Sequence, residues 1–138
     1  LKPVQILVAG DFFLDTYTIG KAKRISPEAP VAVVNVEEQK ALPGGTGNVV
    51  LNLKSLGIKA IPFGRIGNDL YGREIVTSFK QEEIDTEGIL IDPNMLTPNK
   101  MRVISDRQQV VRIDYEKVFP LSHETERKAL EILPSLIE

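Results

Sequence analysis

Residues 4–11, which have the sequence VQILVAGD, decide the fold class of this chain. Their first six residues form a mostly apolar run, rich in β-branched side chains, that stops at Gly10, which is typical of a buried strand in a parallel sheet. Asp11 and Asp15 follow the carboxyl end of that strand, where open α/β sheets bind their ligands. Asp11 is better explained as a turn residue that caps backbone N–H groups, and Asp15 as a candidate ligand residue. We therefore expect an α/β domain with a site after its first strand.

Strands and helices alternate downstream of this run. We predict further strands over residues 16–19, 31–36, 60–63, 88–91, 100–105 and 109–115. We also predict three helices: one that ends at Gly57, one capped by Asn68 or Asp69, and one that Ser122 caps and Pro134 ends or kinks. The strands at 16–19, 31–36, 100–105 and 109–115 fall outside the strand–helix–strand core and predict a second, flatter sheet. Because such a sheet is packed on one face only, we expect it to cover a site or to meet a second copy of itself.

Composition excludes several classes of protein. The chain has 138 residues, a formal net charge of −2, no cysteine and one histidine, which fits one domain and excludes disulfides, thiol catalysis and multi-histidine metal clusters. The charge balance argues against a nucleic-acid partner, and no apolar run reaches the ~18 residues of a membrane span. We therefore expect a soluble, cytoplasmic protein without a membrane or nucleic-acid partner. Because the first residue is Leu1 and not Met, we also expect the chain to be part of a longer one.

Residues 43–48, with the sequence PGGTGN, end a predicted loop and begin a helix. Glycines allow close approach of the backbone to a ligand, and the free N–H groups of a helix start bind anions or sugar hydroxyls. The alternative is an ordinary glycine turn capped by Thr46 or Asn48. The segment is not a P-loop, because no Gly-Lys-Ser/Thr follows, and it is a poor dinucleotide fingerprint, because Val50 stands where the third glycine belongs.

Charged side chains alternate along the last two predicted strands. Lys100 and Arg102 share one strand face, and so do Arg112 and Asp114 on the hairpin partner. Two cations on one strand face can hold a phosphate. The alternative is a solvated face with cross-strand ion pairs. The single histidine, His123, is expected in the first turn of the last helix without a catalytic role.

Several segments resemble one family of enzymes. They are residues 10–15 (GDFFLD), 24–31 (RISPEAPV), 43–48 (PGGTGN), 64–72 (GRIGNDLYG), 97–105 (TPNKMRVIS) and 108–114 (QQVVRID). Together they resemble the ribokinase-like (PfkB) carbohydrate kinases, and within them the D-glycero-D-manno-heptose 7-phosphate kinases, of which the RISPEAPV segment is the specific part. Thr46 and Val50 depart from the usual glycine signature, where smaller residues are common.

The resemblance implies an α/β, ribokinase-like fold: part of a mainly parallel, three-layer sheet core with a small β lid formed by the strands near 16–19, 31–36, 100–105 and 109–115. It implies transfer of phosphate from ATP, with Mg²⁺, to the anomeric hydroxyl of a phosphorylated sugar, in ADP-heptose and lipopolysaccharide core synthesis. The substrate-binding residues would be Asp15, Gly44, Gly45, Asn48, Lys100 and Arg102. In relatives the lid also joins two subunits, so a homodimer is expected.

The catalytic part of such a kinase has no counterpart in this sequence. The Gly-Ala-Gly-Asp segment that carries the catalytic aspartate in the family, and the loops that bind ATP, are absent from residues 1–138. We therefore expect residues 1–138 to be the amino-terminal part of a single sugar-kinase domain that is inactive alone. Whether a nucleotidyltransferase domain follows stays open. The alternatives are a non-catalytic module for sugar-phosphate binding or self-association and, disfavoured by Val50, a dinucleotide-binding oxidoreductase domain.

Overall fold

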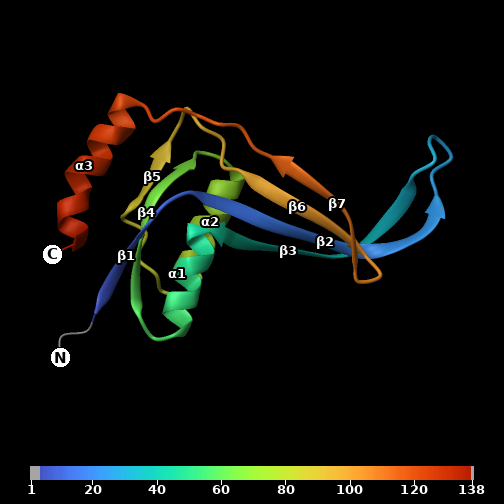
Figure 1. Ribbon diagram of the computed structural model, residues 1–138, viewed down its shortest axis with the longest axis horizontal. Helices are drawn as coiled ribbons and strands as arrows, with labels where there is room; N and C mark the ends of the chain where they lie inside the picture. The colour runs from blue at the N-terminus through green and yellow to red at the C-terminus, as the bar shows by residue number, and fades with distance from the viewer. Residues whose placement is uncertain (1–3, 138) are drawn as a thin grey trace.

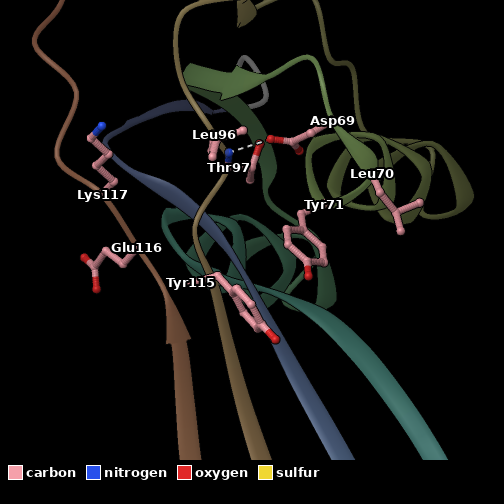
Figure 2. Close-up of a pocket in the computed structure, with 8 residues that line it drawn as sticks. All are labelled: Asp69, Leu70, Tyr71, Leu96, Thr97, Tyr115, Glu116 and Lys117. Carbon is pink, nitrogen blue, oxygen red and sulfur yellow. Dashed lines mark hydrogen bonds between the residues drawn. The ribbon is translucent and has the colours of Figure 1, made fainter.

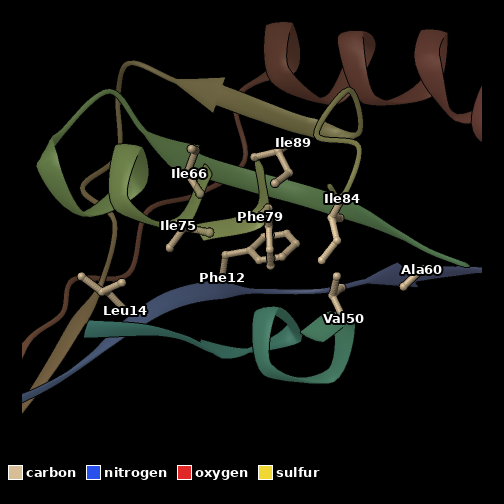
Figure 3. Close-up of a cluster of buried hydrophobic side chains, with 9 residues drawn as sticks. All are labelled: Phe12, Leu14, Val50, Ala60, Ile66, Ile75, Phe79, Ile84 and Ile89. Carbon is tan, nitrogen blue, oxygen red and sulfur yellow. The ribbon is translucent and has the colours of Figure 1, made fainter. Parts of the chain in front are cut away.

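The computed structural model describes residues 4–137 and contains two sheets and three helices (Figure 1). The first sheet is parallel and has the order β1-β4-β5. Its strands are β1 (Gln5–Ala9), β4 (Lys59–Gly67) and β5 (Ile89–Asp92), and the helices are α1 (Thr46–Ser55), α2 (Leu70–Gln81) and α3 (His123–Ile137). Helices α1 and α2 cover one face of this sheet and α3 covers the other (Figures 1 and 3). The predicted three-layer α/β arrangement is present, although β1 is only half-buried.

The second sheet extends away from the first and is called the lid sheet here. It consists of β2 (Phe12–Ile25), β3 (Ala32–Gly45), β6 (Asn99–Ser105) and β7 (Gln108–Tyr115), in the order β3-β2-β6-β7. The pairing of β2 with β6 is parallel, whereas β2–β3 and β6–β7 are antiparallel. All four strands predicted for a separate sheet lie in it. The predicted bounds of the first two were too short, because each of these strands has 14 residues.

The hydrophobic core joins the two sheets. Its buried members are Phe12, Leu14, Val50, Ala60, Ile66, Ile75, Phe79, Ile84 and Ile89 (Figure 3). The Phe12 ring packs edge-to-face on Phe79 of α2, with 6.1 Å between ring centroids, a geometry that aromatic pairs prefer. Because Phe12 and Leu14 belong to β2, the lid sheet is anchored in the core by the start of its own central strand.

The helix ends follow the predicted caps with one exception. Asp69 is the N-cap of α2, and its carboxylate accepts hydrogen bonds from the N–H groups of Gly72 (2.8 Å) and Thr97 (2.7 Å). Ser122 Oγ accepts from the Thr125 N–H (3.1 Å) at the start of α3. Pro134 does not end α3, which continues to Ile137. Within residues 4–137, no helix has the length and apolar character needed to span a bilayer.

Candidate functional site

The glycine segment lies against the start of β2. Gly44 and Gly45 are the last residues of β3, not part of a loop as predicted, because they continue the antiparallel ladder opposite Phe13 and Phe12. A side chain at Gly44 would overlap the Phe13 ring and the Asp15 carboxylate, so only glycine permits this close approach. Gly45 has φ +56° and turns the chain into α1, a conformation that favours glycine. The glycine segment and Asp15 therefore form one edge of a site.

Asn48 and Asp11 lie on either side of this turn. Asn48 is exposed and lies in the first turn of α1, one turn beyond Gly45. The backbone carbonyl of Asp11 accepts a hydrogen bond from the Thr46 N–H (3.2 Å). The Asp11 carboxylate accepts no hydrogen bond from residues 4–137, so the prediction that this side chain caps the turn is wrong. It is the carbonyl of Asp11 that satisfies the first N–H group of the helix.

Asp15 and Arg102 form an ion pair across β2 and β6. The parallel register places Asp15 beside Lys100 and Tyr17 beside Arg102. Arg102 Nη1 donates to Asp15 Oδ1, and the guanidinium lies 5.3 Å from the centroid of the Tyr17 ring. The hydrogen bond to Asp15 is the main reason that the pKa of Arg102 is raised above its ordinary value. Because both side chains are about four-fifths buried, Arg102 fixes the direction of the Asp15 carboxylate.

The remaining cations of the lid sheet differ in what they contact. Arg112 is paired with Asp114 through two hydrogen bonds of 2.9 and 3.0 Å. Lys100 has no ion-pair partner within residues 4–137, and its ammonium lies 4.4 Å from the centroid of the Phe13 ring. Lys100 is therefore the predicted phosphate-binding residue whose charge is least compensated by the chain itself.

A cavity of about 280 Å³ opens beside this edge. It is lined by Asp11, Phe12, Phe13, Arg65, Met95, Pro98, Lys100, Glu116, Lys117, Val118 and Phe119. Of the six predicted substrate-binding residues only Lys100 lines it. Asp15, Gly44 and Arg102 adjoin it through Phe13 and the β2–β6 pairing. The lining of the cavity is mixed, since it offers carboxylates, ammonium groups and phenyl rings.

Arg65 closes one side of the cavity and was not predicted. Its guanidinium donates to Asp92 Oδ2 (2.8 Å) and to the carbonyls of Pro120 (3.2 Å) and Phe119. Burial raises the pKa of Asp92, but hydrogen bonds from the Asn94 N–H and from Arg65 outweigh it, so the pKa is below its ordinary value of 3.8. No local pattern in the sequence pairs Arg65 with Asp92 or with a connection more than 50 residues downstream.

A second cavity shares Glu116 and Lys117 with the first. It has about 370 Å³, and Leu70, Tyr71, Leu96 and Tyr115 give it a mostly apolar lining (Figure 2). The Tyr71 and Tyr115 rings face each other with 6.3 Å between centroids. Because side chains alternate along β7, Tyr115 points to the face opposite Asp114. Asp15 is on the same face as Asp114, because both are paired with Lys100, so Tyr115 lies on the face opposite Asp15.

The remaining candidates for chemistry are the single histidine and clusters of metal-ligating side chains. His123 begins α3, as predicted, and its side chain is fully exposed. Between residues 4 and 137 no group of three or more histidine, cysteine, aspartate or glutamate side chains is arranged to hold a metal ion. No residue of this chain is therefore assigned to Mg²⁺.

Comparison with known proteins agrees with the motifs and the fold. The model of the pfkB family of carbohydrate kinases matches residues 6–133. The bifunctional protein HldE of Helicobacter pylori (strain HPAG1) is 42% identical over 134 residues, which are 97% of this chain and 29% of the relative. The bifunctional protein HldE of Geotalea uraniireducens (strain Rf4) is 44% identical over 132 residues, which are 96% of this chain and 27% of the relative.

Solved structures show the same fold at lower identity. A carbohydrate kinase from Agrobacterium tumefaciens superimposes with a TM-score of 0.64 at 20% identity, over 80% of this chain and 34% of that chain. The present chain thus spans less than one third of the HldE proteins that it matches. The family model covers residues 6–133, and the chain belongs to the pfkB family of carbohydrate kinases.

Proposed function

We propose that this chain forms the sugar-binding and lid part of a kinase that phosphorylates D-glycero-D-manno-heptose 7-phosphate at its anomeric hydroxyl. The observation that carries the proposal is the position of Asp15, held by Arg102 and packed against Gly44, at the edge of a cavity that also contains Lys100. The identity of 42–44% to HldE proteins and the heptose-kinase motifs support the choice of sugar. The product would enter ADP-heptose and lipopolysaccharide core synthesis.

The chemistry of the site suits a polyol that carries a phosphate. Asp15 keeps one carboxylate oxygen, Oδ2, directed toward Gly44 and able to accept hydrogen bonds from sugar hydroxyls. Gly44 and Gly45 let the sugar approach the backbone, and Asn48 adds an exposed amide. Lys100 supplies positive charge for the sugar phosphate, whereas Arg102 acts on the sugar through Asp15. The lid sheet would exclude water from the bound sugar.

The proposed reaction also needs ATP and Mg²⁺. When bound, these groups supply the transferred phosphate and neutralise its charge. In our proposal the residues that bind them, and the catalytic aspartate, lie in a part of the enzyme that this chain does not contain. The 138 residues alone are then inactive. A kinase assay on the isolated, folded chain that detected turnover would contradict this part of the proposal.

We also propose a homodimer formed through the lid sheet. Exposed apolar side chains extend to its far end, where Ile25, Val31, Val36, Val110 and Val111 are each between 46% and 65% exposed. Such a surface is typical of contact with another protein, because isolated sheets seldom leave so many apolar side chains in water. Sedimentation of Val36→Glu and Val111→Glu variants would show monomers if the lid joins the subunits.

The proposed activity is tested with the full-length protein that carries this chain. ATP and D-glycero-D-manno-heptose 7-phosphate should yield a sugar with a second phosphate on its anomeric oxygen, detected by ³¹P NMR. Asp15→Asn should lower kcat/KM by about 100-fold, since a lost hydrogen-bonding carboxylate costs about 1.5–3 kcal/mol. Asp106→Asn, at the β6–β7 turn, is the matched control. Binding of the sugar without any turnover would favour a non-catalytic binding module, and neither binding nor turnover would refute the substrate.

A further inference from the structure

Two lysines border the 280 Å³ cavity in the same way, although they come from different elements. Lys100 is on β6, and Lys117 belongs to the connection between β7 and α3. Each ammonium lies over a phenyl ring that also lines the cavity: Lys100 over Phe13 at 4.4 Å and Lys117 over Phe119 at 5.5 Å. Cation–π contacts of this kind direct an ammonium group without neutralising its charge. One cavity is thus lined by two oriented cations, one from β6 and one from the connection between β7 and α3.

The charges of these lysines are uncompensated, unlike those of their neighbours. Arg65, Arg102 and Arg112 are paired with Asp92, Asp15 and Asp114, respectively. Neither Lys100 nor Lys117 forms an ion pair with any residue between 4 and 137. Asp11 and Glu116, the carboxylates of the cavity lining, are available to hydroxyl groups. A ligand with hydroxyls at one end and an anion at the other matches this distribution.

Arg65 holds the backbone of the segment that carries Lys117. Arg65 donates to the carbonyls of Phe119 and Pro120, and its guanidinium is fixed in turn by the buried Asp92. Figure 2 shows the Lys117 side chain directed away from the Tyr71 and Tyr115 rings, and Lys117 lines both the apolar cavity and the 280 Å³ cavity. The connection is therefore a built wall of the cavity, whose lining includes both Lys117 and Lys100.

We propose that Lys117, together with Lys100, binds the phosphate group that the sugar substrate already carries. This assignment rests on the proposed function, and it adds a specificity residue from a segment outside the family motifs. Lysine ammonium groups bind phosphate as point charges from several directions, so two of them in the lining of one cavity suffice to select a phosphorylated sugar over its unphosphorylated form. The sugar ring then lies between this pair of lysines and Asp15.

The test is calorimetric titration of the full-length protein that carries this chain. The ligands are D-glycero-D-manno-heptose 7-phosphate, the unphosphorylated heptose and inorganic phosphate. Lys117→Met keeps the length of the side chain and removes its charge, and it should weaken binding of the heptose 7-phosphate about tenfold while binding of the heptose is unchanged. The control is Lys128→Met, since Lys128 is an exposed lysine of α3 paired with Glu124. This control should bind all three ligands like the wild type.

The outcomes separate this inference from the proposed function. If Lys117→Met binds the heptose 7-phosphate as tightly as wild type, or loses affinity for both sugars equally, the assignment of Lys117 is overturned and the proposed substrate stands. If wild type binds inorganic phosphate, with a loss in Lys117→Met, but does not bind the heptose 7-phosphate, the anion site stands and the proposed substrate fails. If wild type binds none of the ligands, both are refuted.

Discussion

Replacing Arg65 by methionine should release the connection between β7 and α3. The guanidinium of Arg65 makes three hydrogen bonds, to the Asp92 carboxylate and to the carbonyls of Phe119 and Pro120. Asp92 is 1% exposed and Arg65 is 21% exposed, so the substitution leaves a buried carboxylate without its charged partner. The Asn94 N–H, at 3.0 Å from Asp92 Oδ1, remains and reduces the loss.

The size of the effect follows from these contacts. Removing one member of a buried ion pair costs about 3–5 kcal/mol, and the partial exposure of Arg65 and the remaining bond from Asn94 place this pair below that range. We therefore expect a local destabilisation of about 2 kcal/mol, which is about a 30-fold increase in the population of the opened connection. The methionine preserves most of the aliphatic packing of the arginine, so the loss reports on the polar contacts.

The assay is hydrogen–deuterium exchange on peptides that cover residues 118–127. The amides of Thr125 and Glu126, which bond to Ser122, should exchange faster in Arg65→Met, while amides of α2 should not change. Arg127→Met is the matched control, because Arg127 forms only an exposed i,i+4 pair with Glu131, which is worth about 0.3–0.5 kcal/mol. Equal exchange in Arg65→Met and wild type, or equal acceleration in both variants, would show that Arg65 does not hold the connection.

Three further predictions concern the glycine segment, a buried carboxylate and the core. Gly44→Ala should weaken binding of the sugar phosphate at least about tenfold, because the added methyl displaces Asp15 and Phe13; calorimetry that shows unchanged affinity would contradict this. The folded-state pKa of Asp92 is lowered, so the carboxylate stabilises the fold above pH 3.8, and this stabilisation is lost as the pH falls through the folded pKa. The thermal unfolding temperature of Asp92→Asn should therefore fall less steeply with decreasing pH in this acidic range than that of wild type. Phe79→Ala should lower the free energy of unfolding by about 3–5 kcal/mol in urea titrations, because Phe79 is fully buried. A loss below about 1 kcal/mol would contradict this and would mean that the core collapses into the cavity left by the ring.

The elements of the α/β layer were predictable because their signals are local. The run at residues 4–9 predicted β1, and a cap at Asn68 or Asp69 predicted the start of α2, where the structure has Asp69 as the cap. The strands β2 and β3 of the lid sheet were predicted too short. In β2 the buried side chains include Thr16 and Thr18, whose hydroxyl groups make these positions polar and interrupt the alternation of apolar and polar residues. Most of β3 has polar or exposed residues, so its continuation through residues 37–40 carries no hydrophobic signal.

The sequence predicted candidate residues for the site but not the contacts between them. Asp15 and Arg102 were expected to bind a ligand independently, whereas the structure pairs them with each other across 87 residues of sequence. That contact depends on the parallel register of β2 with β6, which no local pattern specifies. Arg65 and Lys117 gave no signal, because their roles depend on a connection whose position is set by tertiary contacts.

The same parallel pairing determines the order in which the chain can fold. β2 and β3 are consecutive and can form a hairpin early, but β6 lies beyond α1, β4, α2 and β5 in the sequence. Contacts between distant segments close large loops and form slowly, so the lid sheet is completed only after the α/β layer has brought β6 beside β2. During synthesis on the ribosome, the β2 edge stays unpaired until residue 105 has emerged. A chain that is interrupted earlier exposes a strand edge that is prone to pair with other chains.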